Sequence, residues 1–532
     1  MSDLVESVLA TCDSRGPAPA LSRARSVGGS RRGTPRVETL TFAGLALAIR
    51  RTSEGLRARG MRRGDRVLFS VRPGADAVVL ALGIVRAGGT VVFADPGAGE
   101  ALFRARAALA APRWVAAESL LYGASSPLLR PLARRRGLEL PPYARLVPDA
   151  RHVYAGPWLP GVPRGALSLR DLARPSSADE SEREPAPSDA SDEALIVFTS
   201  GTTQRPRAVV HSRGSLGAGL ADVAAAAMSE GQRVVTDQLM VGIPALIAGA
   251  HWLMPAPGLD PGAAPERYLG LLPDAEVLFT APAALDLILR LLDESPHLAP
   301  RGLETLILGG APVLRPLLER ALARFPEVRI RAVYGMTEML PVAIADGAEK
   351  LARPASHGDY VGRIVPSVRA HLDAGELVLA GPGLATGYLG ETPLAEVRTG
   401  DLARIDGDEL TLLGRTKDMF IRGTQNVYPG LYEPAIAGIP GVREAVMTGT
   451  PDNVGDDRIV VLVVPHDDPP ARPDPAHPVA RAVARTLPGL IDAGVLPDLV
   501  VAVAGLPVSG RSRKLDRAAA ADLARAALGV AP

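Results

Sequence analysis

The segment FTSGTTQRPRAVVH, residues 198–211, decides how the rest of this chain is interpreted. It begins at the last residue of an apolar run, 194–198, that predicts a short buried strand, and its polar part ends with two arginines, Arg205 and Arg207. Hydroxyls, backbone N–H groups and a cation in one tight turn are groups that bind a polyphosphate. A turn rich in Ser, Thr and Gly is also common as a plain surface connection. By itself, the segment indicates either a phosphate site or a flexible loop.

The composition narrows the class of protein. With 532 residues the chain is too long for one compact core, so we expect two or more domains. Lys+Arg (59) and Asp+Glu (58) nearly cancel, which gives no electrostatic signature of a nucleic-acid partner. The single cysteine, Cys12, excludes an intramolecular disulfide and a cysteine-based metal cluster. It lies near an N-terminus that we expect to be frayed.

The location of the protein is also predicted from apolar patterning. The first 36 residues lack the apolar core of a secretory signal. The apolar stretch 240–259 is interrupted by prolines and a histidine, so we expect no membrane span. The cytoplasm is the simplest location.

Alternating helix and strand patterns predict a layered α/β fold with a largely parallel sheet. We expect helices over 45–60, 75–87, 283–292 and 314–325, and strands over 66–70, 90–94, 277–280, 305–308, 329–333 and 458–464. Segment 176–193 has no large apolar side chain, which predicts a disordered surface loop. Sheets of this kind bind ligands at the edge where the strands end. We therefore expect one pocket there, lined by Gly310, Ala311 and Pro312 and by the residues after 333.

Two further segments carry groups suited to a nucleotide. In YGMTE, residues 334–338, the aromatic ring can stack on a purine, the hydroxyl can reach a phosphate and the carboxylate can hold Mg²⁺. In TGDL, residues 399–402, the carboxylate can accept hydrogen bonds from both ribose hydroxyls. The ordinary alternatives are a helix cap for the first segment and a turn for the second.

These motifs resemble those of the adenylate-forming enzymes, which include acyl-CoA synthetases, peptide-synthetase adenylation domains and firefly luciferase. They follow one another along the chain in the same order as in that family. Residues 199–208 resemble their phosphate loop, usually TSGTTGxPKG, with Gln204 and Ala208 replacing glycines and Arg207 replacing lysine. YGMTE matches their YGxTE at every fixed position, and GRTKDMFIRG at 414–423 resembles their hinge. The similar segments run from about residue 41 to residue 517, nearly the whole chain.

The resemblance implies a site for ATP and Mg²⁺ and gives each candidate residue a role. Glu338 is expected on the metal, Thr337 near the α-phosphate and Arg207 on the phosphates. Lys514 fits the family lysine that bridges the substrate carboxylate and the phosphate, although Arg513 replaces the preceding glycine and Arg511 is an alternative. Tyr334 is expected against adenine, with Asp401 and Arg415 on the ribose. The expected nucleotide-binding residues are Thr199, Ser200, Gly201, Thr202, Thr203, Gly310, Ala311, Pro312, Tyr334, Gly335, Asp401 and Arg415.

The resemblance also implies the domain organisation. Residues 1–413 are expected to form a large multi-sheet adenylation domain of layered α/β subdomains. Residues 414–532 are expected to form a small, mobile α+β domain. The hinge would lie at about 414–418, with its pivot at Lys417, and Gly423 would begin a loop that forms the pantetheine tunnel. A hinge of this kind lets one small domain serve two half-reactions.

The implied reaction begins with attack of a carboxylic acid on the α-phosphate of ATP, which gives an acyl-adenylate and pyrophosphate. Thioester formation with CoA, or with the phosphopantetheine of an acyl carrier protein, would follow. Because no charged anchor stands out, the natural substrate class is an apolar acid, fatty or 3-hydroxy fatty. Val241, Ile243, Leu246 and Ile247 are candidate pocket residues and equally plausible core.

Three alternatives stay open at this point. Segments 71–73, 94–97 and 338–343 resemble β-lactone synthetases of olefin pathways, which cyclise a 3-hydroxy acid without CoA. An amino-acid adenylation enzyme would use Asp237 to pair with a substrate amine. A non-catalytic nucleotide-binding relative would explain the substitutions at Gln204, Arg207 and Ala208.

Overall fold

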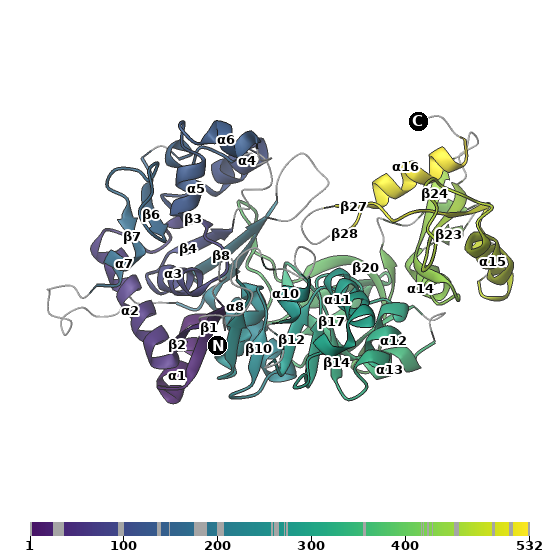
Figure 1. Cartoon of the computed structure of the whole chain (residues 1–532), viewed down its shortest axis with the longest axis horizontal. Helices are drawn as coiled ribbons and strands as arrows, with labels where there is room; N and C mark the ends of the chain where they lie inside the picture. Colours follow the sequence, from purple (N-terminus) through teal and green to yellow (C-terminus); the bar gives the residue numbers. More distant parts are fainter. Residues whose placement is uncertain are drawn as a thin grey trace.

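The computed structural model describes residues 3–24, 37–93, 100–135, 140–147, 149–174, 189–198, 207–256, 259, 265–270, 272, 275–354, 358–415, 418, 420–422, 425–427, 429–451, 457–491, 495–509 and 514–529. Over these residues it is a mixed α/β protein with two large sheets and a smaller C-terminal sheet (Figure 1). The fold class predicted from the sequence is confirmed.

The first large sheet has eight strands in the order β19-β9-β8-β4-β3-β5-β6-β7. All neighbouring strands are parallel except β8 with β9 and β9 with β19. Its strands are β3 (Arg66–Ser70), β4 (Thr90–Phe93), β5 (Trp114–Glu118), β6 (Arg151–Ala155), β7 (Leu167–Ser168), β8 (Glu193–Phe198), β9 (Ala208–Ser212) and β19 (Gly387–Tyr388). The helices nearby in sequence are α2 (Phe42–Ala58), α3 (Ala75–Arg86), α4 (Glu100–Ala110), α5 (Ser119–Ala124), α6 (Arg130–Arg135), α7 (Leu169–Leu172) and α8 (Arg213–Ala227).

The second large sheet has thirteen strands in the order β17-β18-β20-β21-β16-β15-β14-β13-β12-β10-β11-β1-β2. Its strands are β1 (Pro19–Ala24), β2 (Val37–Thr41), β10 (Arg233–Val235), β11 (His251–Met254), β12 (Val277–Thr280), β13 (Thr305–Leu308), β14 (Arg329–Met336), β15 (Met339–Asp346), β16 (Asp359–Ile364), β17 (Arg369–Asp373), β18 (Glu376–Ala380), β20 (Val397–Asp406) and β21 (Glu409–Arg415). Its associated helices are α9 (Leu239–Ile247), α10 (Pro265–Leu269), α11 (Pro282–Glu294), α12 (Arg315–Arg324) and α13 (Gly347–Ala352).

This sheet is parallel from β1 to β14 and antiparallel from β14 to β17. The prediction of a largely parallel sheet therefore holds for only part of it. Only two residues, 337 and 338, separate β14 from β15, and so short a connection permits antiparallel pairing alone. The change of direction at β14 sets the position of the YGMTE segment.

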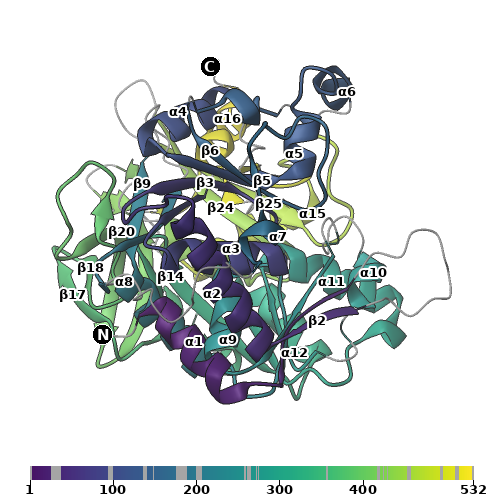
Figure 2. The same cartoon turned by 90° about the vertical axis from the view of Figure 1, so that its left-hand side faces the viewer.

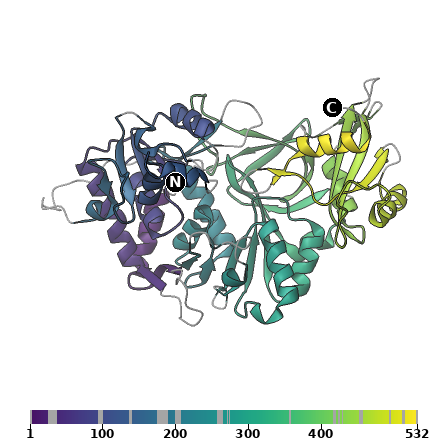
Figure 3. The same ribbon diagram turned by 45° about the horizontal axis from the view of Figure 1, so that its top comes forward.

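The C-terminal part builds a sheet of β24 (Val442–Pro451), β25 (Asp457–Pro465) and β26 (Leu499–Ala502). Two separate apolar cores, one including Val461 and Val463 and the other Val460 and Leu462, lie on its opposite faces. Figure 3 shows this part at one end of the molecule, beside the thirteen-stranded sheet. Its other elements are β22 (Phe420–Arg422), β23 (Gln425–Val427), α14 (Pro429–Ala437), α15 (Pro478–Thr486), β27 (Val508–Ser509), β28 (Lys514–Leu515) and α16 (Arg517–Ala527). The boundary at 413/414 and the mobility of this domain remain predictions.

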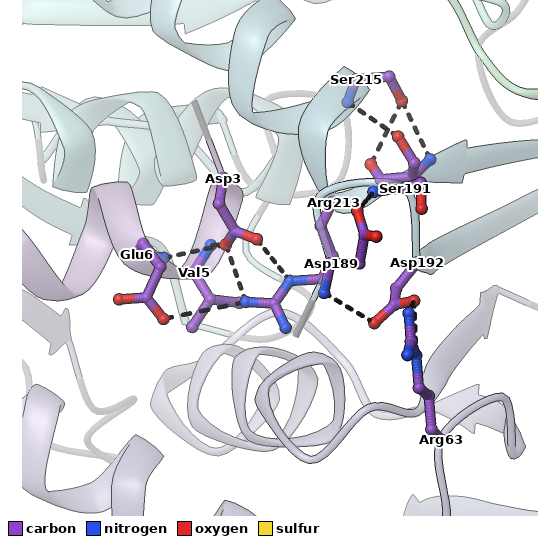
Figure 4. Close-up of polar contacts among 10 residues, drawn as sticks. Asp3, Val5, Glu6, Arg63, Asp189, Ser191, Asp192, Arg213 and Ser215 are labelled. Atoms are coloured by element: carbon purple, nitrogen blue, oxygen red, sulfur yellow. Dashed lines mark hydrogen bonds and ion pairs between the residues drawn. The ribbon is translucent and has the colours of Figure 1, made fainter. Parts of the chain in front are cut away.

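The N-terminus differs from the frayed end that we expected. Residues Leu4–Arg15 form helix α1, which packs beside α2 (Figure 2) and buries Leu4, Val8 and Cys12. Asp3 caps this helix and forms an ion pair with Arg213, whose side chain is 1% exposed, with 2.7 Å between Arg213 Nε and Asp3 Oδ2 (Figure 4). Burial raises the pKa of the Cys12 thiol to about 12, so the thiol is neutral at physiological pH.

The predicted loop over 176–193 is also corrected at its end. Residues 175–188 lie outside the described residues, but 189–193 are held by hydrogen bonds. Ser191 N donates to Asp189 Oδ1 (2.9 Å), and Arg213 N donates to Asp192 O (2.9 Å; Figure 4). Short polar side chains stabilise this turn by bonding to the backbone, which composition alone does not reveal.

Candidate active site

The YGMTE segment lies on a β-hairpin. β14 was expected to end at residue 333, but it continues through Met336, so Tyr334 is a strand residue opposite Ala343 of β15. The pairing shifts register between Tyr334 and Met336. At Gly335 a Cβ atom would lie 2.5 Å from Leu340 Cδ1, which explains the glycine by close packing. Thr337 and Glu338 form the turn of the hairpin.

Tyr334, Asp401 and Arg415 form one hydrogen-bonded group. The hydroxyl of Tyr334 donates to Asp401 Oδ2 (2.6 Å), and Arg415 Nε donates to Asp401 Oδ1 (2.7 Å). Asp401 is 4% exposed, whereas Arg415 is exposed. Burial, and next the charge of Asp401, raise the pKa of Tyr334, so its hydroxyl remains a donor.

Asp401 is a strand residue and not the turn residue that the sequence also allowed. It lies on β20, directly opposite Arg415 of β21. The preceding Gly400 has φ +73°, a conformation that favours glycine, and the pairing of β18 with β20 is irregular here. This irregularity bends the chain at residues 399–401, where Thr399 Oγ1 accepts a hydrogen bond from Asp401 N (3.0 Å).

Glu338, Tyr388 and Arg207 form a second group. The hydroxyl of Tyr388 donates to Glu338 Oε1 (2.8 Å), and Glu338 is 8% exposed. The Arg207 guanidinium carbon lies 3.8 Å from the centre of the Tyr388 ring. Arg207 also forms an ion pair of 3.1 Å with Glu391. Arg207 and Glu338, both predicted for the site, are thus joined through a tyrosine that the sequence analysis did not select.

His211 connects strand β9 to the hairpin turn. Its Nε2 lies 2.7 Å from the carbonyl oxygen of Thr337, and its Nδ1 lies 3.2 Å from Ser215 Oγ. A carbonyl only accepts, so Nε2 carries the proton and Nδ1 accepts from the Ser215 hydroxyl. Burial lowers the pKa of His211, which favours this neutral form. Sequence reasoning missed His211, and its only signal was its place at the end of the phosphate-loop segment.

The remaining predicted residues fall into three groups. Gly310, Ala311 and Pro312 follow β13, the parallel neighbour of β14, and Gly310 has φ +81°. Lys514 lies on β28 opposite Ser509. Thr199, Ser200, Gly201, Thr202 and Thr203 of the phosphate loop, the hinge residue Lys417 and the tunnel residue Gly423 lie outside the described residues.

The candidate acyl-pocket residues belong to the core. Val241, Ile243 and Leu246 are buried in the main apolar cluster, and Ile247 packs against it. Their helix α9 approaches Trp252 so closely that a Cβ at Gly242 would lie 1.9 Å from the indole ring. Asp237, the candidate partner of a substrate amine, is exposed and accepts a hydrogen bond from Gln238 Nε2 (3.4 Å).

Two properties of the described residues bear on metals and membranes. They contain no cluster of three or more His, Cys, Asp or Glu side chains that could hold a metal ion. Within the same part of the chain, no helix is both long enough and apolar enough to span a bilayer.

Comparisons with known proteins identify the family and the fold of this chain. Residues 18–389 match the sequence model of the family described as AMP-binding enzyme. A feruloyl-CoA synthase of Amycolatopsis sp is 28% identical over 459 residues, covering 80% of this chain and 84% of the relative. A long-chain-fatty-acid–CoA ligase of Thermus thermophilus is 29% identical over 498 residues, covering 83% of each chain. The crystal structure of the anthranilate CoA ligase AuaEII with anthranoyl-AMP has the same fold, with a TM-score of 0.76 at 18% identity over 99% of this chain and 98% of that one.

The fold and the matched sequence define an adenylate-forming ligase. The chain belongs to the AMP-binding enzyme family.

Proposed function

We propose that this enzyme activates a carboxylic acid with MgATP as an acyl-adenylate and then transfers the acyl group to the thiol of CoA. The proposal rests on one observation. Tyr334 of β14 and Arg415 of β21 both donate hydrogen bonds to the buried carboxylate of Asp401 on β20. Such a carboxylate, next to an aromatic ring, suits the ribose and base of a nucleotide. The family membership supports the same conclusion.

The nucleotide would be held chiefly by this group. Asp401 would accept the ribose hydroxyls at the lone pairs of Oδ1 and Oδ2 that Arg415 and Tyr334 leave open. Arg415, opposite on β21, would keep the carboxylate oriented. The ring of Tyr334 would pack against adenine.

The site also fits Mg²⁺. In phosphate sites this ion takes one or two carboxylates and completes its shell with phosphate oxygens and water, so a cluster of three protein ligands is not required. Glu338 uses Oε1 for Tyr388, and no contact among the described residues uses its Oε2. The ion would neutralise charge on the phosphates, while Arg207 and Lys514 would stabilise the charge that develops during attack.

The acid itself supplies the nucleophile, so no nucleophilic side chain is needed and the enzyme acts by positioning. We propose an apolar acid, fatty or 3-hydroxy fatty, with an aromatic acid as the next class to test. CoA is the preferred acceptor because the two sequence relatives are named as CoA-dependent enzymes. The phosphopantetheine of a carrier protein is the alternative acceptor.

One assay tests the proposal: pyrophosphate release across fatty, 3-hydroxy fatty, aromatic and amino acids, with and without CoA, and mass analysis of the products. Acid-dependent release and a CoA thioester are expected. Release without any acid, or no release with any acid, would contradict the proposal. CoA-independent conversion of a 3-hydroxy acid into a neutral product would instead identify a β-lactone synthetase.

A further inference from the structure

Tyr388 occupies the point where two predicted functional residues meet. Its hydroxyl donates to Glu338 Oε1 at 2.8 Å, and its ring face receives the guanidinium of Arg207 at 3.8 Å. One side chain therefore contacts both the proposed metal ligand and the cation at the exit of the phosphate loop. Neither residue is near Tyr388 in sequence, since they precede it by 50 and 181 positions.

The backbone fixes Tyr388 in this place. β19 pairs antiparallel with β9, with Tyr388 opposite Val209, and Leu389 N donates to Ala208 O (2.9 Å). On the other side, Ala385 N donates to the carbonyl oxygen of Glu338 (2.8 Å). Residues 385–388 thus hold both the main chain and the side chain of Glu338.

The chemistry of the contact suits an orienting role. The phenol donates its one proton to Glu338 Oε1. A single donor on Oε1 fixes the rotation of the carboxylate and leaves Oε2 for another ligand. Hydrogen bonds of this kind to metal ligands alter metal affinity by about 10- to 100-fold.

We propose that Tyr388 is a positioning residue for adenylation, which orients Glu338 toward the Mg²⁺ of ATP and couples that carboxylate to Arg207. The inference rests on the proposed function, because it assigns Glu338 to the metal. It predicts that loss of the hydroxyl weakens metal binding, whereas loss of an equivalent hydroxyl elsewhere does not. If Tyr388 only filled space, a substitution that removed the hydroxyl but kept the ring would leave the metal affinity unchanged.

The test is Tyr388→Phe, which keeps the ring for Arg207 and removes only the hydroxyl. Mn²⁺ binding is titrated by electron paramagnetic resonance in the presence of α,β-methylene-ATP, which cannot be cleaved to an adenylate. Tyr388→Phe should bind Mn²⁺ about 10- to 100-fold more weakly than the wild type. Tyr360→Phe is the matched control, since the Tyr360 hydroxyl also lies near a glutamate, Glu349 (3.5 Å), and it should bind as the wild type does.

Activity gives a second readout. The Mg²⁺ concentration that half-saturates pyrophosphate release should rise by the same factor in Tyr388→Phe, and the rate should recover at saturating Mg²⁺. In a Glu338→Gln background, Tyr388→Phe should have little further effect on Mn²⁺ binding, because the hydroxyl acts through the carboxylate.

The outcomes separate the two proposals. Unchanged Mn²⁺ binding in Tyr388→Phe, or a full additional loss in the Glu338→Gln background, overturns the role of Tyr388. If the wild type shows no Mn²⁺ binding with the analogue and no acid-dependent pyrophosphate release, the proposed function itself fails.

Discussion

Asp401 and Arg415 face each other across strands β20 and β21, with 2.7 Å between Asp401 Oδ1 and Arg415 Nε. The buried member of the pair is the carboxylate, and the guanidinium lies at the exposed end of β21. Arg415 therefore orients the carboxylate before any nucleotide arrives. This arrangement reduces the reorganisation that binding requires.

Asp401→Asn should raise the KM for ATP by about 10- to 100-fold, because hydrogen bonds to a charged group contribute about 1.5–3 kcal/mol. The measurement is acid-dependent ATP–pyrophosphate exchange at varied ATP. Asp408→Asn is the control, since Asp408 pairs with Arg363 in an exposed ion pair and should leave the KM unchanged. An unaltered KM in Asp401→Asn would refute the ribose assignment.

Lys514→Ala should slow adenylation by about 100-fold or more, which is typical for loss of a group that stabilises transition-state charge. Thioester formation from a supplied acyl-adenylate should be retained, because that step does not build charge on the attacked phosphate. The two half-reactions are measured separately. Equal loss of both would contradict the assignment, and a larger effect of Arg511→Ala would move the role to Arg511.

Asp3→Asn should lower the free energy of unfolding by about 3 kcal/mol, because it removes the closer charged partner of the buried Arg213 guanidinium and leaves the 3.9 Å contact with the exposed Glu6. Urea denaturation measures the change. Asp13→Asn removes an exposed carboxylate that pairs with Arg50, and it should cost less than about 1 kcal/mol. Equal effects of the two substitutions would show that the Asp3–Arg213 pair adds no stability through burial.

His211 should make the folded protein sensitive to acid. Burial lowers its pKa in the folded state, whereas the unfolded chain takes up the proton near pH 6.5. The stabilisation that the neutral imidazole gives is therefore present above about pH 6.5. It is lost as the pH falls, and the free energy of unfolding then decreases by about 1.4 kcal/mol per pH unit. The difference in unfolding free energy between the wild type and His211→Gln should narrow from about pH 7.5 to about pH 5.5. A widening difference would contradict a neutral His211.

Much of the fold follows from local patterns. Strands 66–70, 277–280 and 305–308 have the predicted bounds, because each is a short, largely apolar run of the length typical of a buried strand. The predictions were wrong at the end of β14, at residues 189–193 and at the N-terminal helix. In each case the structure depends on specific contacts that composition does not reveal: the antiparallel partner β15 for β14, side-chain bonds to the backbone at 189–193, and the side chain of Arg213 for the N-terminal helix.

The sequence by itself determined the α/β class, the order of the nucleotide-binding motifs and the family resemblance, because these depend on residue types at short spacings. Only the tertiary structure decided which of these residues touch. Tyr334 meets Asp401 across 67 positions, and Tyr388 meets Glu338 across 50. Periodicity shows which face of a strand is buried, but the neighbouring strand and its register are set by the packing of the whole sheet. For that reason the role proposed for Tyr388 could be found only in the folded chain.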